Sequence, residues 1–367
     1  MSATGHMLAT ALIKEQKRAL ITRYARPNNF SAALQILNTL LPYAALWYAV
    51  ALSAEVSYWL TAGITLLMVL FLARIFVLMH ECGHGSLFRT GRLNRGFGFV
   101  LGVLSAMPQY VWSQHHAYHH STNGNWAKYR GPFVVDTVDD YAAMDEKQRR
   151  RYRFLRRMWM LPLHAFVYAL LMPRYTWLRG SASLLWHVAS GRRAAFKTAY
   201  WNSPLEYRHM TWNNIVLLSL WLAMSLAIGP ALFFAVYVVS LSLATAVGLT
   251  LFTVQHNFEH SYASGDEGWD YETAAIEGTS FLVLPGWLNW FTANIAYHHI
   301  HHLSASIPNY RLAQCHEEHQ HLFSGVARIR LAEIPQALSY ILWDVRARRI
   351  ISVAEFEAQA AAEAVAA

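Results

Sequence analysis

Long stretches without a charged side chain constrain this sequence more than any other feature. No Asp, Glu, Lys or Arg occurs at positions 27–54 or 56–73. A helix needs about 20 apolar residues to cross a bilayer, and each stretch supplies them. The short segment Ser53–Ser57 leaves room only for a tight turn. We therefore expect a transmembrane hairpin with spans at about 34–52 and 56–79.

A second hairpin is predicted further along the chain. Positions 209–258 carry no charged side chain, and Gly229-Pro230 interrupts this run with a typical turn signal. We expect spans at about 213–228 and 231–255. Charged residues make up 14% of the chain, against about 25% in ordinary globular proteins, which favours a membrane protein. The apolar stretches 96–113 and 158–173 are short and contain Pro, so we expect both at the membrane interface.

Basic residues suggest an orientation. They cluster at Lys14–Arg26 and Lys147–Arg157, whereas the two predicted hairpin tips carry none. The positive-inside rule then places both termini and the central region in the cytoplasm. The predicted organisation is a cytosolic N-terminal segment at 1–30, a membrane domain at 31–345 and an Ala/Glu-rich C-terminal tail at 346–367.

Histidines carry the strongest chemical signal. The chain has nineteen, and twelve of them fall into four tight groups. The groups are His80 and His84; His115, His116, His119 and His120; His256 and His260; and His298, His299, His301 and His302. Residues three or four apart share one face of a helix, so the members of a group can converge.

Such a collection of imidazoles needs partners for its ring nitrogens, and metal ions supply them. Eight or more histidines exceed the capacity of one ion, which indicates two. Imidazole suits Zn, Cu, Fe and Ni, so the spacings leave the metal open. With only two cysteines, Cys82 and Cys315, a four-cysteine site is excluded.

At this point the sequence resembles the integral-membrane fatty acid desaturases. That family has three histidine boxes, H-x3/4-H, H-x2/3-HH and H/Q-x2/3-HH. The matching text here is HECGHGSLF at 80–88, HHAYHHSTNG at 115–124 and NIAYHHIHHLSASIPNYRL at 294–312. The resemblance implies an all-α membrane protein with four transmembrane helices in two hairpins, interfacial helices and a cytosolic helical cap. It also implies a di-iron centre that faces the cytoplasm.

The resemblance assigns residues to that centre. Family members tend to add a ligand at the end of the fourth span, here His256 or His260, with a slight preference for His256. The implied metal ligands are His80, His84, His116, His119, His120, His256, His260, His298, His301 and His302. Four further residues are candidates for groups that hydrogen-bond to the ligands: Glu81, His115, Asn123 and His299.

The implied reaction is O2-dependent desaturation of a fatty acyl chain in a lipid or an activated acyl group. An unactivated methylene has no acidic proton and no leaving group, so the difficult chemistry must belong to the cofactor. We find neither a fused cytochrome b5 segment nor a dinucleotide-binding motif in the sequence. Electrons are therefore expected from a separate donor, a ferredoxin or a cytochrome b5. Nucleic acid is not an expected partner.

Two other reactions fit part of the pattern. A hydroxylase of the same superfamily, acting on an acyl chain, alkane or carotenoid, would use similar ligands. Residues 80–84 also fit the H-E-x-x-H motif of zinc metalloproteases, with Glu81 as general base. That motif is short and leaves the other histidine groups unexplained.

Several side chains carry smaller expectations. The basic stretch 147–157 could dock an acidic electron donor, although a surface that faces lipid headgroups is the simpler interpretation. We expect Arg74 to extend toward the membrane interface. His316, His319 and His321 are expected on the surface.

Overall fold

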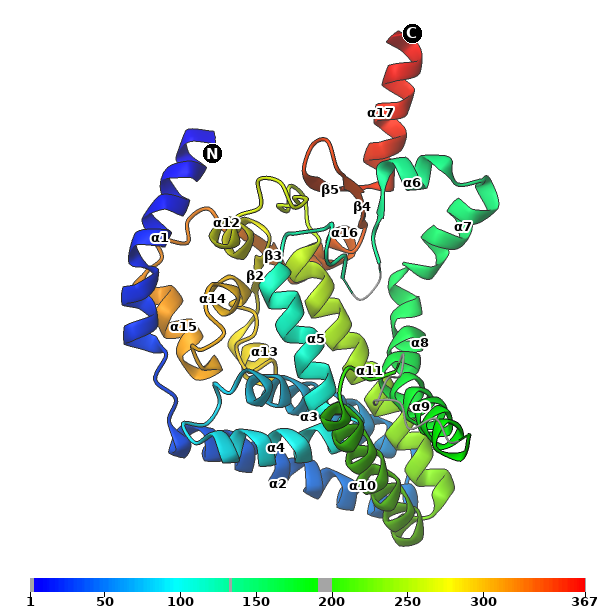
Figure 1. Cartoon of the computed structure of the whole chain (residues 1–367). Coiled ribbons are helices and arrows are strands. Elements are labelled where there is room, and N and C mark those ends of the chain that lie inside the picture. Colours follow the sequence, from blue (N-terminus) through cyan, green and yellow to red (C-terminus); the bar gives the residue numbers. More distant parts are fainter. Residues whose placement is uncertain (1–2, 132–133, 191–199, 367) are drawn as a thin grey trace. The chain divides into compact units, whose positions relative to one another are not determined.

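The computed structural model describes residues 3–131, 134–190 and 200–366, and helices dominate them. Four helices are long and apolar enough to cross a membrane (Figure 1). They are α2 (Asn29–Ala54), α3 (Tyr58–His84), α10 (Pro204–Ile228) and α11 (Pro230–His256). They form the two predicted hairpins, and the all-α membrane fold class is confirmed. The α2, α10 and α11 helices extend beyond their predicted spans, whereas α3 begins two residues and ends five residues later than predicted.

The chain divides into two compact units that interleave along the sequence. Unit 1 contains Met1–Arg26, Ala117–Leu161 and Leu249–Ala367, and unit 2 contains Pro27–His116 and Pro162–Gly248. Two helices that carry histidines, α5 (Gln109–Thr122) and α11, therefore begin in unit 2 and end in unit 1.

In unit 2, polar side chains set the limits of the first hairpin. Asn28 caps α2 by accepting hydrogen bonds from the backbone N–H groups of the first turn, and Ser57 caps α3 in a similar way. The Ser53 and Thr61 hydroxyls lie 2.9 Å apart and join the two helices beside the turn. The α3 helix ends at Gly85, whose φ of 72° suits a residue without a side chain.

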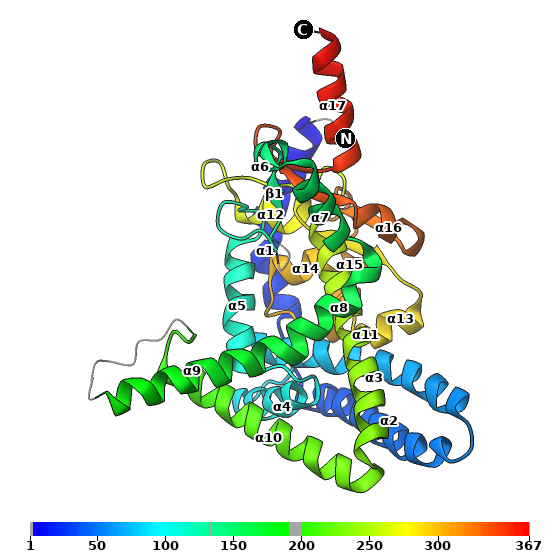
Figure 2. The same cartoon turned by 90° about the vertical axis from the view of Figure 1, so that its right-hand side faces the viewer.

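The core of unit 2 joins the second hairpin to shorter helices. Val103 of α4 (Gly91–Leu104) and Leu170 of the π-turn η2 (Val167–Leu171) pack with Leu217 of α10 and Phe233 of α11. The α9 helix (Met172–Ala189) packs against α10 (Figure 2). At 1.5 Å per residue, α4 with its 14 residues is about 21 Å long, less than the roughly 30 Å of bilayer hydrocarbon.

One arginine of unit 2 does not behave as expected. Arg74 does not extend to the interface but is 2% exposed. Its Nε donates a hydrogen bond to the Thr39 hydroxyl at 2.9 Å, and a terminal nitrogen donates to Gln35 Oε1 at 3.2 Å. Thr39 and Gln35 are one turn apart on α2, so the neighbouring helix supplies the acceptors that a buried guanidinium requires.

In unit 1, a hydrophobic core closes around a short histidine-rich helix, α14 (His298–Leu303). Ile13 and Leu20 of α1 (Ala3–Tyr24) pack there together with residues of α12 (Tyr271–Glu277) and α15 (Asn309–Glu318). Ion pairs along α1 add to this packing. They are Lys14–Asp270 at 2.6 Å, Lys17–Glu272 at 2.8 Å and Arg23–Glu318.

Two small sheets complete unit 1, and neither was predicted. The β4 strand (Tyr340–Asp344) pairs in parallel with β1 (Asp136–Thr137) and antiparallel with β5 (Arg349–Ser352). The β2 strand (Ser280–Val283) runs parallel to β3 (Ala327–Arg330). The remaining elements are α6 (Val138–Ala143), α7 (Glu146–Leu155), η1 (Met158–Met160), α8 (Leu161–Phe166), α13 (Gly286–Phe291), η3 (Leu331–Glu333), α16 (Ile334–Ala337) and α17 (Val353–Ala366).

Candidate metal centre

The first histidine cluster lies in unit 2, at the end of α3 and in α5. His80 and His84 are one turn apart on α3, and their Nε2 atoms are separated by 3.2 Å. The ring of His116 lies 4.5 Å from that of His80 and 5.0 Å from that of His84, measured between centroids. One ring nitrogen from each of the three lies within 4.8 Å of the other two. We call these three residues the unit 2 cluster.

A buried carboxylate supports the unit 2 cluster. Oε1 of Glu81 lies 3.1 Å from His80 Nδ1, and the Ser86 hydroxyl donates to Oε2 at 3.1 Å. A hydrogen bond from Nδ1–H to the carboxylate leaves the lone pair of His80 Nε2 for a metal ion. Glu81 is 0% exposed, so its carboxylate holds a histidine and does not face water. This geometry argues against Glu81 as the general base of a metalloprotease.

The turn that follows α3 fixes the position of His84. Asn94 Nδ2 donates to the carbonyl groups of Gly85 at 2.9 Å and Phe88 at 2.8 Å, while its Oδ1 accepts from the Phe88 N–H at 2.9 Å. The Asn94 side chain is 3% exposed. Three hydrogen bonds from one buried amide therefore hold the chain just beyond the ligand helix.

The second histidine cluster lies in unit 1 and draws on α5, α11 and α14. One ring nitrogen each from His119, His256 and His302 lies within 4.8 Å of the other two. The Nε2 atom of His298 is 3.0 Å from that of His256, and the Nε2 atom of His301 is 3.1 Å from that of His120. These six residues, which we call the unit 1 cluster, are all buried.

Carbonyl and hydroxyl groups support the unit 1 cluster. His256 Nδ1 lies 3.2 Å from the Gly278 carbonyl oxygen, and the Tyr271 hydroxyl donates to the His302 carbonyl at 2.7 Å. The imidazoles of His120 and His302 stack with centroids 4.1 Å apart and an angle of 5° between planes. Burial lowers the pKa of His302 well below its usual value, with further contributions from His120 and the other nearby imidazoles. The neutral form, which binds metals, is therefore favoured.

Both clusters fit metal ions. Two nitrogens bound to one ion at about 2.0–2.1 Å, with an angle of about 90–110° between them, lie roughly 2.9–3.4 Å apart. The closest nitrogen pairs of the two clusters are separated by 3.2, 3.0 and 3.1 Å. In unit 1, the buried Nε2 of His302 has no hydrogen-bond partner among the described residues. A metal ion would satisfy that atom.

The other predicted residues lie outside these clusters. His260 is 72% exposed in its side chain, has a φ of 63° and lies beside Glu259. His115 is exposed on α5. Asn123 donates a hydrogen bond to the Ala274 carbonyl at 2.8 Å and lines a narrow opening with His119 and His256.

His299 contacts a second buried histidine, His316, which the sequence did not lead us to expect in the interior. Its Nε2 lies 3.0 Å from Nδ1 of His316, and both imidazoles are buried. The expectation that His316 lies on the surface is therefore wrong; His319 is half-buried and His321 is exposed. Burial, assisted by the charge of Arg328, lowers the pKa of His316 to about 4. The sequence held a signal, because Leu312 and Cys315 precede His316 at the helical spacing of a buried face.

Several arginines of the basic stretch 147–157 make contacts within unit 1. Arg149 donates to the carbonyl groups of Tyr141 and Ala142, and Arg153 pairs with Glu146 and Glu357. The Arg156 guanidinium stacks over the Tyr152 ring at 3.4 Å from its centroid. These arginines stabilise the packing of α7. Fewer basic side chains of this stretch are therefore left to contact an electron donor.

The chain is similar to known fatty acid desaturases over most of its length. The fatty acid desaturase family matches residues 57–330. A fatty acid desaturase of Bacillus subtilis (strain 168) is 34% identical over 340 residues, which are 92% of this chain and 90% of that protein.

Plant proteins are also similar. An endoplasmic reticulum omega-3 fatty acid desaturase of Vigna radiata var. radiata is 29% identical over 65% of this chain and 59% of its own length. A chloroplastic sn-2 acyl-lipid omega-3 desaturase (ferredoxin) of Helianthus annuus is 26% identical over 66% of this chain and 52% of its own length. The chain thus spans little more than half of these plant relatives. With its four apolar helices and its histidine clusters, it belongs to the fatty acid desaturase family of membrane enzymes.

Proposed function

We propose that this protein converts a saturated –CH2–CH2– unit of a membrane lipid acyl chain into a double bond. One O2, two electrons and two protons would be consumed with the two substrate hydrogens, and two molecules of water would be released. The observation that carries the proposal is the convergence of buried, neutral histidine nitrogens within a member of this family. The names of the relatives support a fatty acyl substrate.

Nine histidines would hold two iron ions. In this assignment His80, His84 and His116 bind one ion. His119, His256 and His302 bind the other ion, and His120, His298 and His301 complete the ligand set of the two ions. Of the two candidates at the end of α11, His256 fits because it is buried among other histidines, whereas His260 is exposed beside Glu259.

The side chains around the clusters have separate tasks. When bound, the iron would supply the O2 activation that no amino-acid side chain provides. Glu81 would hold the proton of His80 at Nδ1, and the Gly278 carbonyl would hold that of His256, so that each Nε2 stays available. Burial of the clusters excludes water and so limits side reactions.

An external protein would supply the electrons, of the ferredoxin or cytochrome b5 type. One relative is named for ferredoxin. Of the basic residues at 147–157, Lys147, Arg150, Arg151 and Arg157 are exposed, and Arg150 pairs with Glu146. We place the contact with an acidic donor at the other three. Charge reversal at Arg151 should lower turnover with the natural donor, whereas an unchanged rate would reject this contact.

We further propose that both clusters face the cytoplasm and that residues 1–30 lie there too. The support is the position of the basic residues relative to the hairpin tips. A cysteine introduced at Val56, in the first tip, should react with a membrane-impermeant thiol reagent from outside the cell. Reaction only after the membrane is permeabilised would reverse the orientation.

The decisive experiment combines lipid and metal analysis. A host that expresses the chain should gain unsaturated acyl chains, and the purified protein should contain about two iron ions. His302→Ala should abolish the new double bonds and lower the iron content. His260→Ala is the matched control and should retain both. An alcohol in place of the alkene would indicate a hydroxylase, and a protein without iron would reject the proposed centre.

A further inference from the structure

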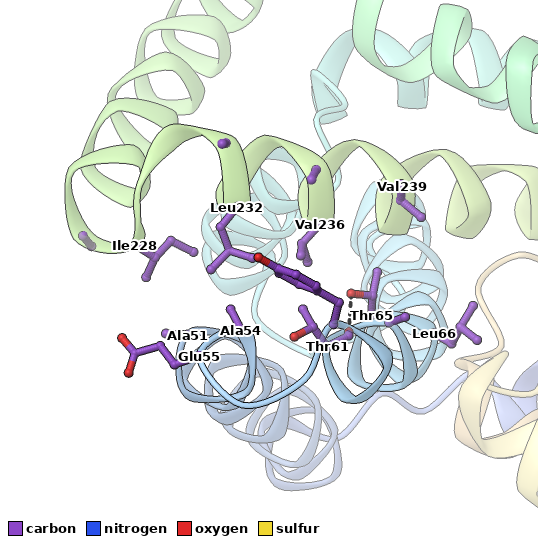
Figure 3. Close-up of a pocket in the computed structure, with 15 residues that line it drawn as sticks. Ala51, Ala54, Glu55, Thr61, Thr65, Leu66, Ile228, Leu232, Val236 and Val239 are labelled. Atoms are coloured by element: carbon purple, nitrogen blue, oxygen red, sulfur yellow. Dashed lines mark hydrogen bonds between the residues drawn. The ribbon is translucent and has the colours of Figure 1, made fainter.

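Unit 2 contains a pocket of about 940 Å³ between the tips of its two hairpins (Figure 3). The ends of α2 and α10 and the beginnings of α3 and α11 form its walls. Along α3, the lining residue nearest to the unit 2 cluster is Leu66, 14 positions before His80. At 1.5 Å per residue they are about 21 Å apart, so this pocket is separate from that cluster.

Most of the pocket lining is apolar, and its uncharged polar side chains are Tyr58, Thr61 and Thr65. Leu232 and Val236 of α11 face Thr61 and Thr65 of α3 across it (Figure 3). The Thr65 hydroxyl donates to the Thr61 carbonyl at 2.8 Å, and the Thr61 hydroxyl bonds to Ser53 and to the Ser57 carbonyl. Because their hydroxyls are used by the helices, the threonines offer mainly methyl groups. Such a lining suits an acyl chain.

The mouth of the pocket carries a negative charge. Glu55, in the turn between α2 and α3, is exposed and is the only charged side chain among the described lining residues. Unit 2 has just two other carboxylates. Glu81 lies against His80, and Glu206 accepts a hydrogen bond from the Asn202 N–H. The charge at the mouth therefore favours a cationic group and disfavours an anionic one.

We propose that this pocket binds one membrane lipid with an ammonium headgroup, namely phosphatidylethanolamine. The ammonium group pairs with Glu55, and one acyl chain lies between α3 and α11. The volume falls within the roughly 300–1,000 Å³ of typical ligand sites, in which a few polar groups orient an otherwise apolar ligand. The lipid would join the two hairpins at the end away from the unit 2 cluster. This binding requires neither iron nor O2, so it can be tested apart from the proposed reaction.

The test uses the full chain in detergent micelles that contain equal amounts of phosphatidylethanolamine and phosphatidylglycerol. Native mass spectrometry then counts the lipids that stay bound. The wild type should retain one phosphatidylethanolamine in about fivefold preference over phosphatidylglycerol. Glu55→Gln should remove this preference, because it deletes the charge and preserves the size of the side chain.

A second pair of variants tests the location. Ala235 lines the pocket and is exposed, so Ala235→Phe should block the site without disturbing the core. Ala45 is exposed on α2 outside the pocket, and Ala45→Phe is the matched control that should retain the lipid. Equal retention of both lipids by the wild type, preference for phosphatidylglycerol, or undiminished binding by Ala235→Phe would each overturn the proposal.

Discussion

The two units hold their histidines by different means. In unit 2, the carboxylate of Glu81 contacts the Nδ1 side of His80. In unit 1, a backbone carbonyl, that of Gly278, takes the same position beside His256, and a tyrosine hydroxyl binds the backbone of His302. Both arrangements orient an imidazole, but only the first places a full negative charge behind it.

The supply of acidic residues does not explain this difference. Unit 2 contains three of the 22 acidic residues of the chain, and one of them is Glu81. Unit 1 contains the rest, and several of these form ion pairs with α1 near the surface. Ion pairs near the surface contribute little, typically less than about 1 kcal/mol. A single buried carboxylate at a ligand is therefore expected to affect function more than the many acids of unit 1.

Removal of Glu81 should have the largest effect. Glu81→Ala should weaken iron binding by the unit 2 cluster about 100-fold, and Glu81→Gln about tenfold, because Gln keeps an acceptor for His80 Nδ1 but loses the charge. Iron titration of the purified protein would measure both, with the second ion bound as in the wild type. Glu272→Gln, which removes a half-buried acid of unit 1 that pairs with Lys17, is the control. Wild-type affinity in both Glu81 variants would show that the buried charge does not support iron binding by the unit 2 cluster.

The next comparison concerns the polar contacts that fix each cluster. Asn94→Ala removes three hydrogen bonds in unit 2 and should lower the free energy of unfolding by about 2 kcal/mol. Asn123→Ala removes the side-chain bond to Ala274 in unit 1 and should cost about 1 kcal/mol. Thermal unfolding in detergent would rank the two variants. If both variants lost the same free energy of unfolding, the three hydrogen bonds of Asn94 would stabilise the fold no more than the single bond of Asn123.

Local patterns in the sequence predict much of this architecture. The charge-free runs locate the four long helices, since a bilayer demands a fixed length of apolar helix. The spacing of His80 and His84, or of His298, His301 and His302, indicates which rings share a face. These features depend on neighbours in the sequence, so they can be read without a structure.

Features that depend on distant partners are not predictable in this way. The β1 strand pairs with β4, about 200 residues later, and β1 has only two residues. Arg74 is buried because Thr39 and Gln35 face it from another helix. The carbonyl support of His256 comes from Gly278, and a carbonyl leaves no trace in side-chain identity. In each case the deciding contact belongs to the tertiary structure.

The next prediction concerns His316, a buried histidine of unit 1 whose ring contacts another histidine and not a carboxylate. The pKa of His316 is lowered to about 4, so its neutral form is favoured in the folded state. Its contribution to stability is present above pH 6.5 and is lost as the pH falls toward 4, by up to about 1.4 kcal/mol per pH unit. Between pH 7 and pH 5, the unfolding temperature of His316→Gln should therefore fall less than that of the wild type. His321→Gln, at an exposed position, should follow the wild type.

The smallest expected effect tests the hydroxyl support of unit 1. Tyr271→Phe deletes the 2.7 Å hydrogen bond to the His302 carbonyl and preserves the ring. One neutral hydrogen bond contributes about 1 kcal/mol, so iron binding by the unit 1 cluster should weaken about fivefold. Tyr262→Phe removes the bond to the Gly268 carbonyl and the bond accepted from the Asp270 N–H, and it should leave iron binding unchanged. If Tyr271→Phe weakened iron as strongly as Glu81→Ala, backbone anchoring would matter as much as the buried charge, and the distinction between the two units would fail.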